Sequence, residues 1–468
     1  MHSDVSRAAI LNLLRLLLMI VLIAAVCGGA HAGQDASSST ALSTDLPKAV
    51  LPSHPPAIES VHGETYDTFD VNTATEAYLA KIPANKRAAS DAYFEGGYWL
   101  ILWDFLVGVV ITIFLLSAGI SWRMRDFAER LTRFKPLQSI IYSVELILVV
   151  SLLDLPMTIY EGYIREHKYA LLNQSFGPWF KEQLINLVIS LILLPIFIAV
   201  LMGFVRKFPR TWWVWAAGAS VVLILFIQLI APVFILPQFN TYKKLEDRSV
   251  RDPILSMARA NGIPATDVYE VDASRQSNRV SANVSGFLST QRITLNDNLL
   301  QRCSMAEIEA VMGHEMGHYV LNHSYKMAMF FIIMAVLMFA YLNWSLNKCL
   351  ARWGDAWKIR GITDIAILPL AMLLLSIVGL LTTPIGNTAV RMQEFEADMY
   401  GLNASQQPDG EAEVDLKLGE YRKMSPSPAE EIIFFDHPSG RTRIHTAMQW
   451  KKEHLAGAPL VFGPAQQK

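Results

Sequence analysis

The sequence predicts a predominantly α, polytopic membrane protein, in which a multi-span helical bundle carries a small α+β domain at one membrane face. Hydrophobic residues make up 52% of the 468 residues and charged residues only 18%, a balance typical of chains with several membrane spans. Apolar runs long enough to cross a bilayer recur along the chain, and polar segments at 237–325 and 387–468 alternate with them. The net charge of −2 gives no electrostatic reason to expect a nucleic-acid partner.

Residues 1–32 have the pattern of an export signal. Arg7 and Arg15 flank the start of an apolar stretch at 16–27, and Ala-His-Ala at 30–32 offers a small-residue cleavage site. An uncleaved anchor helix is the alternative, and both interpretations put residue 33 outside the cytoplasm. We expect residues 33–97 to form an extracytoplasmic tether, because the first half of this segment is rich in Ser, Pro and Ala.

Six further apolar runs are expected to span the membrane: 98–120, 138–160, 184–204, 212–236, 326–346 and 364–386. The first four form a membrane domain over 98–236, and the last two belong to a second domain over 237–468. Four polar residues inside these runs are expected to face the bundle interior or a water-filled cavity, because a lipid-facing carboxylate is costly. They are Asp104, Glu145, Asp154 and Gln228, with an interfacial position as the alternative for Asp104.

The distribution of basic residues predicts the orientation. Loops 121–137, 205–211 and 347–363 contain five, three and four Lys or Arg residues, whereas loop 161–183 on the other side contains three. The side richer in Lys and Arg is expected to be cytoplasmic. The two polar segments then face outward, which agrees with the export signal.

The stretch VMGHEMGHYVLNH at 311–323 contains the strongest chemical motif. Ser304 and Glu307 form a capping box, so a helix is expected to begin there and to present His314 and His318 on one face. Two imidazoles one turn apart can bind one tetrahedral zinc ion, and Glu315 can act as general base on a metal-bound water. Gly317 has no side chain, so it leaves space on the helix beside the site.

A catalytic zinc site needs a third protein ligand, and EFEADMYG at 394–401 supplies a candidate. Glu394 and Asp398 lie four residues apart, so we expect Glu394 to bind the metal and Asp398 to accept a hydrogen bond from a ligand imidazole. Glu396 is expected to be a surface or salt-bridge residue, and Gly401 fits the end of a helix. The site would hold one zinc ion per chain.

Other candidates near the motif are set aside. His323 lies nine residues after His314, about half a turn around a continuous helix, so it is expected to point away from the metal. Cys27, Cys303 and Cys349 are too few and too scattered for a disulfide framework or a cysteine-based metal site. We expect Cys303 and Cys349 to be unpaired thiols.

Several spaced motifs resemble the membrane-integral zinc metalloproteases of the type I CAAX prenyl protease family. Besides HEMGH and EFEAD, the resemblance covers four further segments, which are EHKYALLNQSFGPWFKEQL (166–184), APVFILPQFNTYKKLED (231–247), DVYEVDASRQSNRVSANVSGF (267–287) and DHPSGRTRI (436–444). It extends from about residue 98 to 445. It implies a gluzincin-like domain with His314, His318 and Glu394 as zinc ligands and Glu315 as base.

The resemblance also implies roles for residues that spacing alone leaves open. His437 and Arg443 would stabilise the oxyanion or grip the peptide, where a turn residue and a solvated charge are the alternatives. Asn283, Val284, Ser285 and Gly286 would form the substrate-binding strand. One departure is Ser281, which occupies the position where the family commonly has Asn, so the side-chain role of an Asn in this strand is open.

We therefore expect a membrane-embedded zinc endopeptidase that acts on a protein or peptide substrate, for example in the quality control of membrane and exported proteins. The expected location is the bacterial inner membrane, with the lipid bilayer as partner and the catalytic domain on the extracytoplasmic side. A cytosol-facing protease of the CAAX type, a transporter and a non-catalytic peptide-binding scaffold are the alternatives. The sequence does not identify an adaptor.

Overall fold

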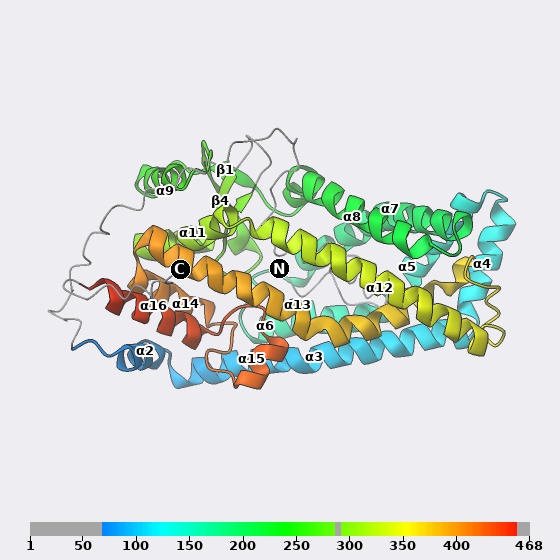
Figure 1. The fold of residues 1–468 in the computed structure, drawn as a ribbon, viewed down its shortest axis with the longest axis horizontal. Coiled ribbons are helices and arrows are strands. Elements are labelled where there is room, and N and C mark those ends of the chain that lie inside the picture. Colours follow the sequence, from blue (N-terminus) through cyan, green and yellow to red (C-terminus); the bar gives the residue numbers. More distant parts are fainter. Residues whose placement is uncertain (1–67, 286–291, 456–468) are drawn as a thin grey trace, which may run out of the picture.

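Five helices are long and apolar enough to cross a membrane in the part of the chain that the computed structural model describes, residues 68–285 and 292–455. They run side by side along the long axis of the molecule (Figure 1). These helices are α3 (Ala84–Ser117), α5 (Lys135–Ile159, continued by η1 Tyr160–Arg165 and α6 Glu166–Lys168), α7 (Phe176–Lys207), α12 (His323–Trp353) and α13 (Leu368–Ser405). The predicted fold class, a multi-span bundle with a small α+β domain, is confirmed.

Five of the six expected spans correspond to these helices. The remaining one, the run 212–236, forms a shorter apolar helix than expected. In this run the chain forms α8 (Trp212–Ile230). Its apolar part, Trp212–Ile227, is shorter than the five spanning helices. The π-helix η2 (Ala231–Ile235) follows directly and has a proline near its start. Proline lacks the N–H that continues a regular helix, so the apolar sequence changes helix type before its end.

Two of the three acidic side chains that the sequence places inside the spans are buried in the bundle. Asp104 and Asp154 are both buried, as expected from the cost of a charge in lipid. Glu145 is only partly buried, and the side chain of Gln228 lies outside the described residues. A large apolar cluster, which includes Leu115, Tyr142 and Val150, fills the end of the bundle away from the sheet.

The expected tether over 33–97 is corrected in its C-terminal part. Helix α2 (Val71–Ala80) begins at the capping residue Asp70, and its residues Val71 and Leu79 pack with α16 (Gly440–His454) in one apolar cluster. Helix α3 then starts at Ala84, fourteen residues before the expected span. A short polar helix is stable here because it buries one face against the C-terminal domain. The predicted export signal over 1–32 and the residues up to 67 lie outside the described residues.

The polar segment 237–325 folds into a four-stranded sheet with helices on one side. Its strands are β1 (Tyr242–Lys244), β2 (Val268–Val271), β3 (Ala282–Ser285) and β4 (Arg292–Asn296). The order is β1-β2-β4-β3, with β2 and β4 parallel and the other pairs antiparallel. Buried apolar residues of the sheet pack against α9 (Arg248–Ala260) and α11 (Met305–Val320). Strand β3 therefore lies at the sheet edge beside α11.

The last polar segment completes the domain around α11 and α13. It contains α14 (Pro408–Leu418), α15 (Pro428–Phe434) and α16, while α10 (Asp297–Arg302) precedes α11. The two free cysteines that the structure describes, Cys303 and Cys349, are unpaired as expected.

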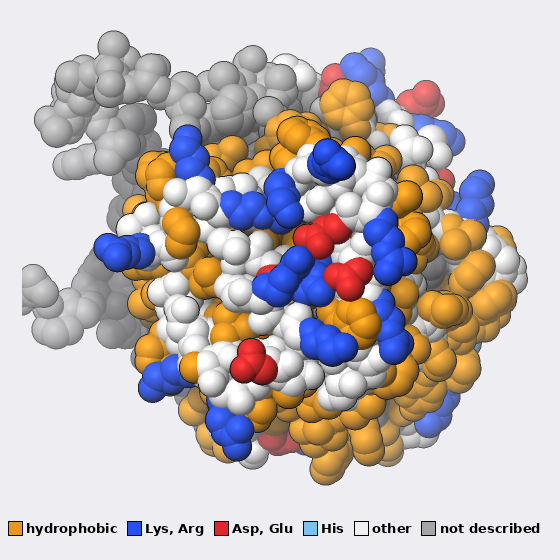
Figure 2. Space-filling view, turned by 90° about the vertical axis from the view of Figure 1, so that its right-hand side faces the viewer, with side chains coloured by type: hydrophobic (Ala, Val, Ile, Leu, Met, Phe, Trp, Pro, Cys, Tyr) orange, Lys and Arg blue, Asp and Glu red, His pale blue; other side chains and the backbone are white. Residues whose placement is uncertain are grey.

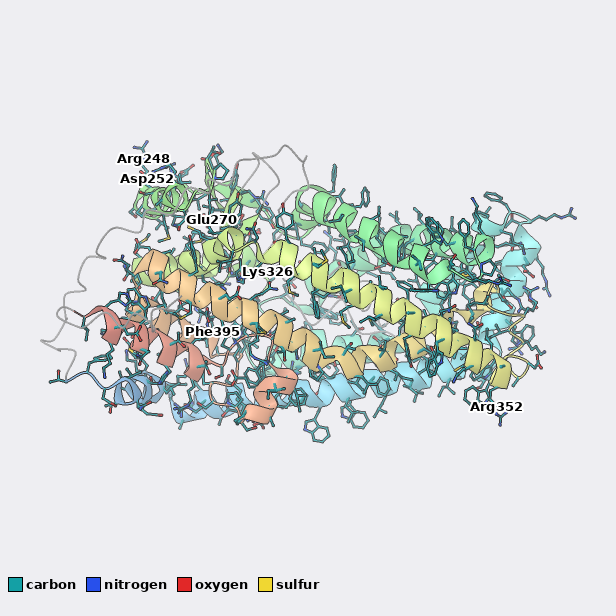
Figure 3. The ribbon with its side chains drawn as sticks, in the orientation of Figure 1. Arg248, Asp252, Glu270, Lys326, Arg352 and Phe395 are labelled. Carbon is teal, nitrogen blue, oxygen red and sulfur yellow. The ribbon has the colours of Figure 1, made fainter. Side chains whose placement is uncertain are left out.

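The end of the bundle opposite the sheet is rich in basic side chains (Figure 2). Exposed Lys and Arg there come from α4 (Ile120–Leu131) and from the loops after α4, α7 and α12, for example Arg123, Arg210 and Lys358. Figure 3 places Lys326 at the start of α12 near the sheet and Arg352 at its far end. A buried ion pair between Arg125 and Asp364, with 2.7 Å between nitrogen and oxygen, fixes the loop that joins α12 to α13.

Candidate active site

Helix α11 meets helix α13 at glycines that allow the two backbones to touch. The predicted capping box of Ser304 and Glu307 starts α11. A Cβ on Gly313 would lie 2.8 Å from the carbonyl oxygen of Gly401, and one on Gly317 would lie 3.1 Å from that of Ala397. Gly401 does not end a helix as expected, because α13 continues to Ser405; it is instead a contact point with α11. The crossing brings the two predicted ligand helices together.

The three predicted ligands converge at this crossing. The Nε2 atoms of His314 and His318 lie 2.9 Å apart, and the Glu394 carboxylate oxygens lie 3.3 Å and 3.6 Å from them. One donor atom from each residue lies within 4.8 Å of the others, so the group could hold a metal ion. Two imidazoles and one carboxylate are a donor set that suits catalytic zinc.

His314 is supported from behind by a buried ionic cluster. Its Nδ1 lies 2.7 Å from Oδ1 of Asp398, as predicted for this carboxylate. Arg443 donates to both carboxylate oxygens of Asp398, at 3.0 Å and 2.6 Å, and also pairs with Glu411 and Asp415 of α14. This geometry corrects the expected role of Arg443 in gripping substrate, because its guanidinium is buried and engaged by three carboxylates. Arg443 is therefore connected to His314 through Asp398.

His323 does not point away as expected. Its Nδ1 lies 2.8 Å from Nδ1 of His318, and its Nε2 lies 3.0 Å from Oε2 of Glu396. The expectation assumed one continuous helix, but α11 ends at Val320 and α12 begins at His323. Asn322 between them has a φ of 57°, the left-handed conformation that ends helices. Glu396 forms the expected salt bridge, with Lys326 at 2.6 Å.

Glu315 is buried beside the three candidate ligands. Its Oε2 has no hydrogen-bond partner among the described residues. Burial raises the pKa of the Glu315 carboxyl to about 8, and a divalent cation nearby would act in the opposite direction because it favours the ionised form. Burial also lowers the pKa of His318 to about 4, which keeps this imidazole neutral and able to bind a metal.

His437 lies on the accessible side of the site. Its Nε2 is 3.2 Å from Oε2 of Glu394, and its Nδ1 is 2.7 Å from Oδ1 of Asp436. The side chain keeps partial exposure, unlike those of the three candidate ligands. It is therefore placed to contact a substrate that reaches the metal-binding group.

The expected substrate strand is β3, which includes Asn283, Val284 and Ser285, whereas Gly286 lies outside the described residues. Among the described strands β3 pairs only with β4, and Asn283 lies opposite Thr294. The side chain of Val284 is buried in the domain core, so it does not face a ligand. An edge strand can still accept an extended peptide through its backbone.

A bundle of membrane-spanning helices with a buried His, His and Glu group beside a further glutamate defines a membrane-embedded metallopeptidase. Comparison with known families agrees: Peptidase family M48 matches residues 244–451, and the CAAX prenyl protease N-terminal region, described as five membrane helices, matches residues 71–241. The chain therefore belongs to peptidase family M48 and is a membrane metalloprotease. This result confirms the resemblance found in the sequence.

Individual relatives support this assignment. The chain is 30% identical over 349 residues to the uncharacterized metalloprotease YhfN of Bacillus subtilis, which covers 73% of this chain and 82% of the relative. It is 26% identical to CAAX prenyl protease 1 of Saccharomyces cerevisiae, over 65% of this chain and 70% of the relative. The crystal structure of S. mikatae Ste24p has the same fold, with a TM-score of 0.68, 22% identity, and coverage of 81% of this chain and 94% of that one.

Proposed function

We propose that this membrane metalloprotease is a zinc-dependent endopeptidase in which His314, His318 and Glu394 bind the metal and Glu315 is the general base. The observation that carries the proposal is the convergence of these donor atoms beside a buried glutamate. Both ligand imidazoles have their Nδ1 atoms engaged, by Asp398 and His323, so both Nε2 atoms turn to the same point. A bound zinc ion would supply the Lewis acidity that lowers the pKa of a water and polarises the scissile carbonyl.

The other side chains have separate tasks in this mechanism. Glu315 accepts a proton from the attacking water and delivers it to the leaving amine. His437 donates a hydrogen bond to the oxyanion that develops on the scissile carbonyl. The edge of β3 aligns an extended peptide by backbone hydrogen bonds, which needs no particular side chain at Ser281.

The substitution Glu315→Gln tests the base. It should lower casein cleavage at least about 100-fold, because general-base catalysis is worth that much or more, while zinc content stays unchanged. Glu309→Gln, on the same helix but bonded to Gln407, is the matched control and should cleave normally. Turnover by Glu315→Gln near that of the control would exclude Glu315 as the base. Removal of zinc by a chelator should abolish cleavage in both the control and the parent protein.

We further propose that the active site faces away from the cytoplasm and that the enzyme acts on membrane or exported proteins in a bacterial inner membrane. The proposal is supported by the concentration of basic side chains at the opposite end of the bundle, since such residues favour the cytoplasmic side. A cytosol-facing site would instead suit the processing of cytosolic C-termini, an alternative that relatives named CAAX prenyl protease 1 suggest.

Single reporter cysteines distinguish the two orientations. His445→Cys on α16 lies at the site end and Lys348→Cys at the basic end, and both positions are exposed. The three native cysteines are replaced by serine, and intact cells are treated with a membrane-impermeant maleimide. Labelling at 445 and not at 348 is expected. The reverse pattern would place the site in the cytoplasm and overturn the proposed substrates.

A further inference from the structure

A cavity of about 420 Å³ lies between α3 and the end of the helix formed by α5, η1 and α6. It is separate from the metal-binding group, and none of the three candidate ligands lines it. Its walls divide into two kinds: an apolar part with Leu100, Val107 and Met157, and a polar part with Arg165 and Lys168. A cavity of this size and composition is suited to an amphipathic ligand.

The cavity lies at the boundary between membrane and water. The apolar run of α3 starts near residue 98, and that of α5 ends near residue 160. The polar ends of both apolar runs therefore lie at the cavity. Trp99 and Trp103 line it and remain 64% and 55% exposed. Large exposed aromatic side chains at this depth are typical of the interface between hydrocarbon and headgroups. The cavity thus opens where lipid headgroups lie.

The charge at the cavity is positive. Arg165 and Lys168 are the charged residues among its described lining residues, and Lys168 forms no ion pair within the described part of the chain. Arg165 is buried: it donates to the carbonyl of Tyr93, and its guanidinium carbon lies 3.8 Å from the centre of that ring. Glu166 lies 3.7 Å from Arg165, but Arg279 and the Tyr93 hydroxyl, each at 2.6 Å, already bond its carboxylate.

Gly96 keeps space open beside the guanidinium. A Cβ at this position would lie 3.9 Å from a terminal nitrogen of Arg165, so a larger side chain would project into the cavity. The buried cation therefore stays accessible from the cavity.

We propose that this cavity binds the headgroup of an anionic phospholipid. The phosphate lies between Lys168 and Arg165, and the acyl chains follow the apolar wall formed by Trp103, Val107 and Met157. Basic pockets between transmembrane helices recognise anionic headgroups by this combination of charge and depth. The proposal does not depend on the proteolytic mechanism.

A lipid bound here would hold the turn after η1 against α3, and that turn continues into the catalytic domain. The segment after α6 pairs with the residues that lead into β3: Asn173 donates its backbone N–H to Gln276 at 2.9 Å, and Asn278 bonds the carbonyl of Ala170 at 2.9 Å. The lipid site is thereby connected to the expected substrate strand by a short series of hydrogen bonds.

Native mass spectrometry of the full-length protein in a neutral detergent tests the proposal, with phosphatidylglycerol and phosphatidylcholine as probes. Phosphatidylglycerol should bind more tightly than phosphatidylcholine. Lys168→Gln should weaken phosphatidylglycerol binding about fivefold, as expected for one interfacial lysine. Lys181→Gln, an exposed lysine of the same membrane side, is the matched control and should bind as the parent does. Gly96→Leu should abolish the bound species by filling the cavity.

Other results would overturn the proposal. Equal binding of the two lipids would show that charge plays no part. Unchanged phosphatidylglycerol binding in Lys168→Gln, whose exposed position makes misfolding no explanation, would exclude this cavity as the site. Displacement of the lipid by inorganic phosphate at equal concentration would show that the acyl chains contribute nothing, and a free phosphate site would replace the lipid site.

Discussion

The two histidines of the candidate metal-binding group, His314 and His318, are supported in different ways. His314 is backed by Asp398 and then by Arg443, and this series is buried throughout, with Glu411 and Asp415 around the same guanidinium. Behind His318, a chain of hydrogen bonds runs through His323 to Glu396 and reaches the protein surface. The His323 side chain is 1% exposed, whereas that of Glu396 is 45% exposed.

This difference in burial indicates which side of the site is rigid and which side can adjust. A buried cation with three carboxylates has no water to replace a lost partner, so removal of one member leaves uncompensated charge. An ion pair at the surface is screened and contributes little. We infer that the His314 side fixes the position of the metal-binding group, whereas the His318 side adjusts the strength of one ligand.

The largest effect is expected from Arg443→Met. Removal of the cation leaves three buried carboxylates without their partner, which should lower the free energy of unfolding by about 3–5 kcal/mol. Thermal unfolding in detergent measures this change. Arg441→Met is the matched control on the same helix, because Arg441 pairs with Glu76 at the surface, where an ion pair contributes little. Equal melting temperatures for the two variants would contradict the proposed rigidity of the His314 side.

An intermediate effect is expected from His323→Leu. It removes the hydrogen-bond partner of His318, and loss of such a partner typically weakens metal affinity about 10–100-fold. Competition with a chromophoric chelator measures the affinity. His323→Gln should recover part of it, because its amide can still bond Nδ1 of His318. Unchanged zinc affinity in His323→Leu would mean that His323 contributes packing alone.

The smallest effect is expected from Glu396→Gln. Glu396 shares its carboxylate between His323 and Lys326 at the protein surface, so its charge should change zinc affinity less than about fivefold. The effect should also shrink as salt is added, since exposed charges are screened. A loss as large as that in His323→Leu, independent of salt, would show that the series is as rigid as the one behind His314.

The convergence of His314, His318 and Glu394 could be predicted from sequence because its signals are local. The capping box fixes the start of α11, and the spacing of His314 and His318 then sets one face. Glu394 and Asp398 repeat that spacing on a second helix, and both lie where they were expected. Apolar runs likewise predicted five spans, since each signal lies within one continuous stretch of chain.

The further supports, His323 behind His318 and Arg443 behind Asp398, could not be predicted in the same way. The position of His323 depends on the break at Asn322, and an angle counted along one helix has no meaning across such a break. Asn just after a helix is a signal of that break, and it was available in the sequence. Arg443 meets Glu411 and Asp415 only through the packing of α16 on α14, and no spacing along the chain encodes that contact.

The tether prediction was wrong in its C-terminal part, from Val71 on, for a related reason. Val71 and Leu79 lie eight residues apart on one face of α2, but their packing partner α16 is more than 350 residues away in the chain. Local composition predicts whether a segment is polar, and distant partners decide whether it is ordered.

The contact of Gly313 with Gly401 has a consequence for the metal-free enzyme. Because the two ligand helices touch through their backbones, the spacing of the ligands is set by helix packing and does not require an ion to organise the chain. Small zinc domains differ, since their folding and metal binding are one event. Here the conformational entropy of the site is already lost when the helices pack. If the proposed zinc site is correct, removal and return of the metal should leave the protein folded, and activity should recover as fast as metal is added.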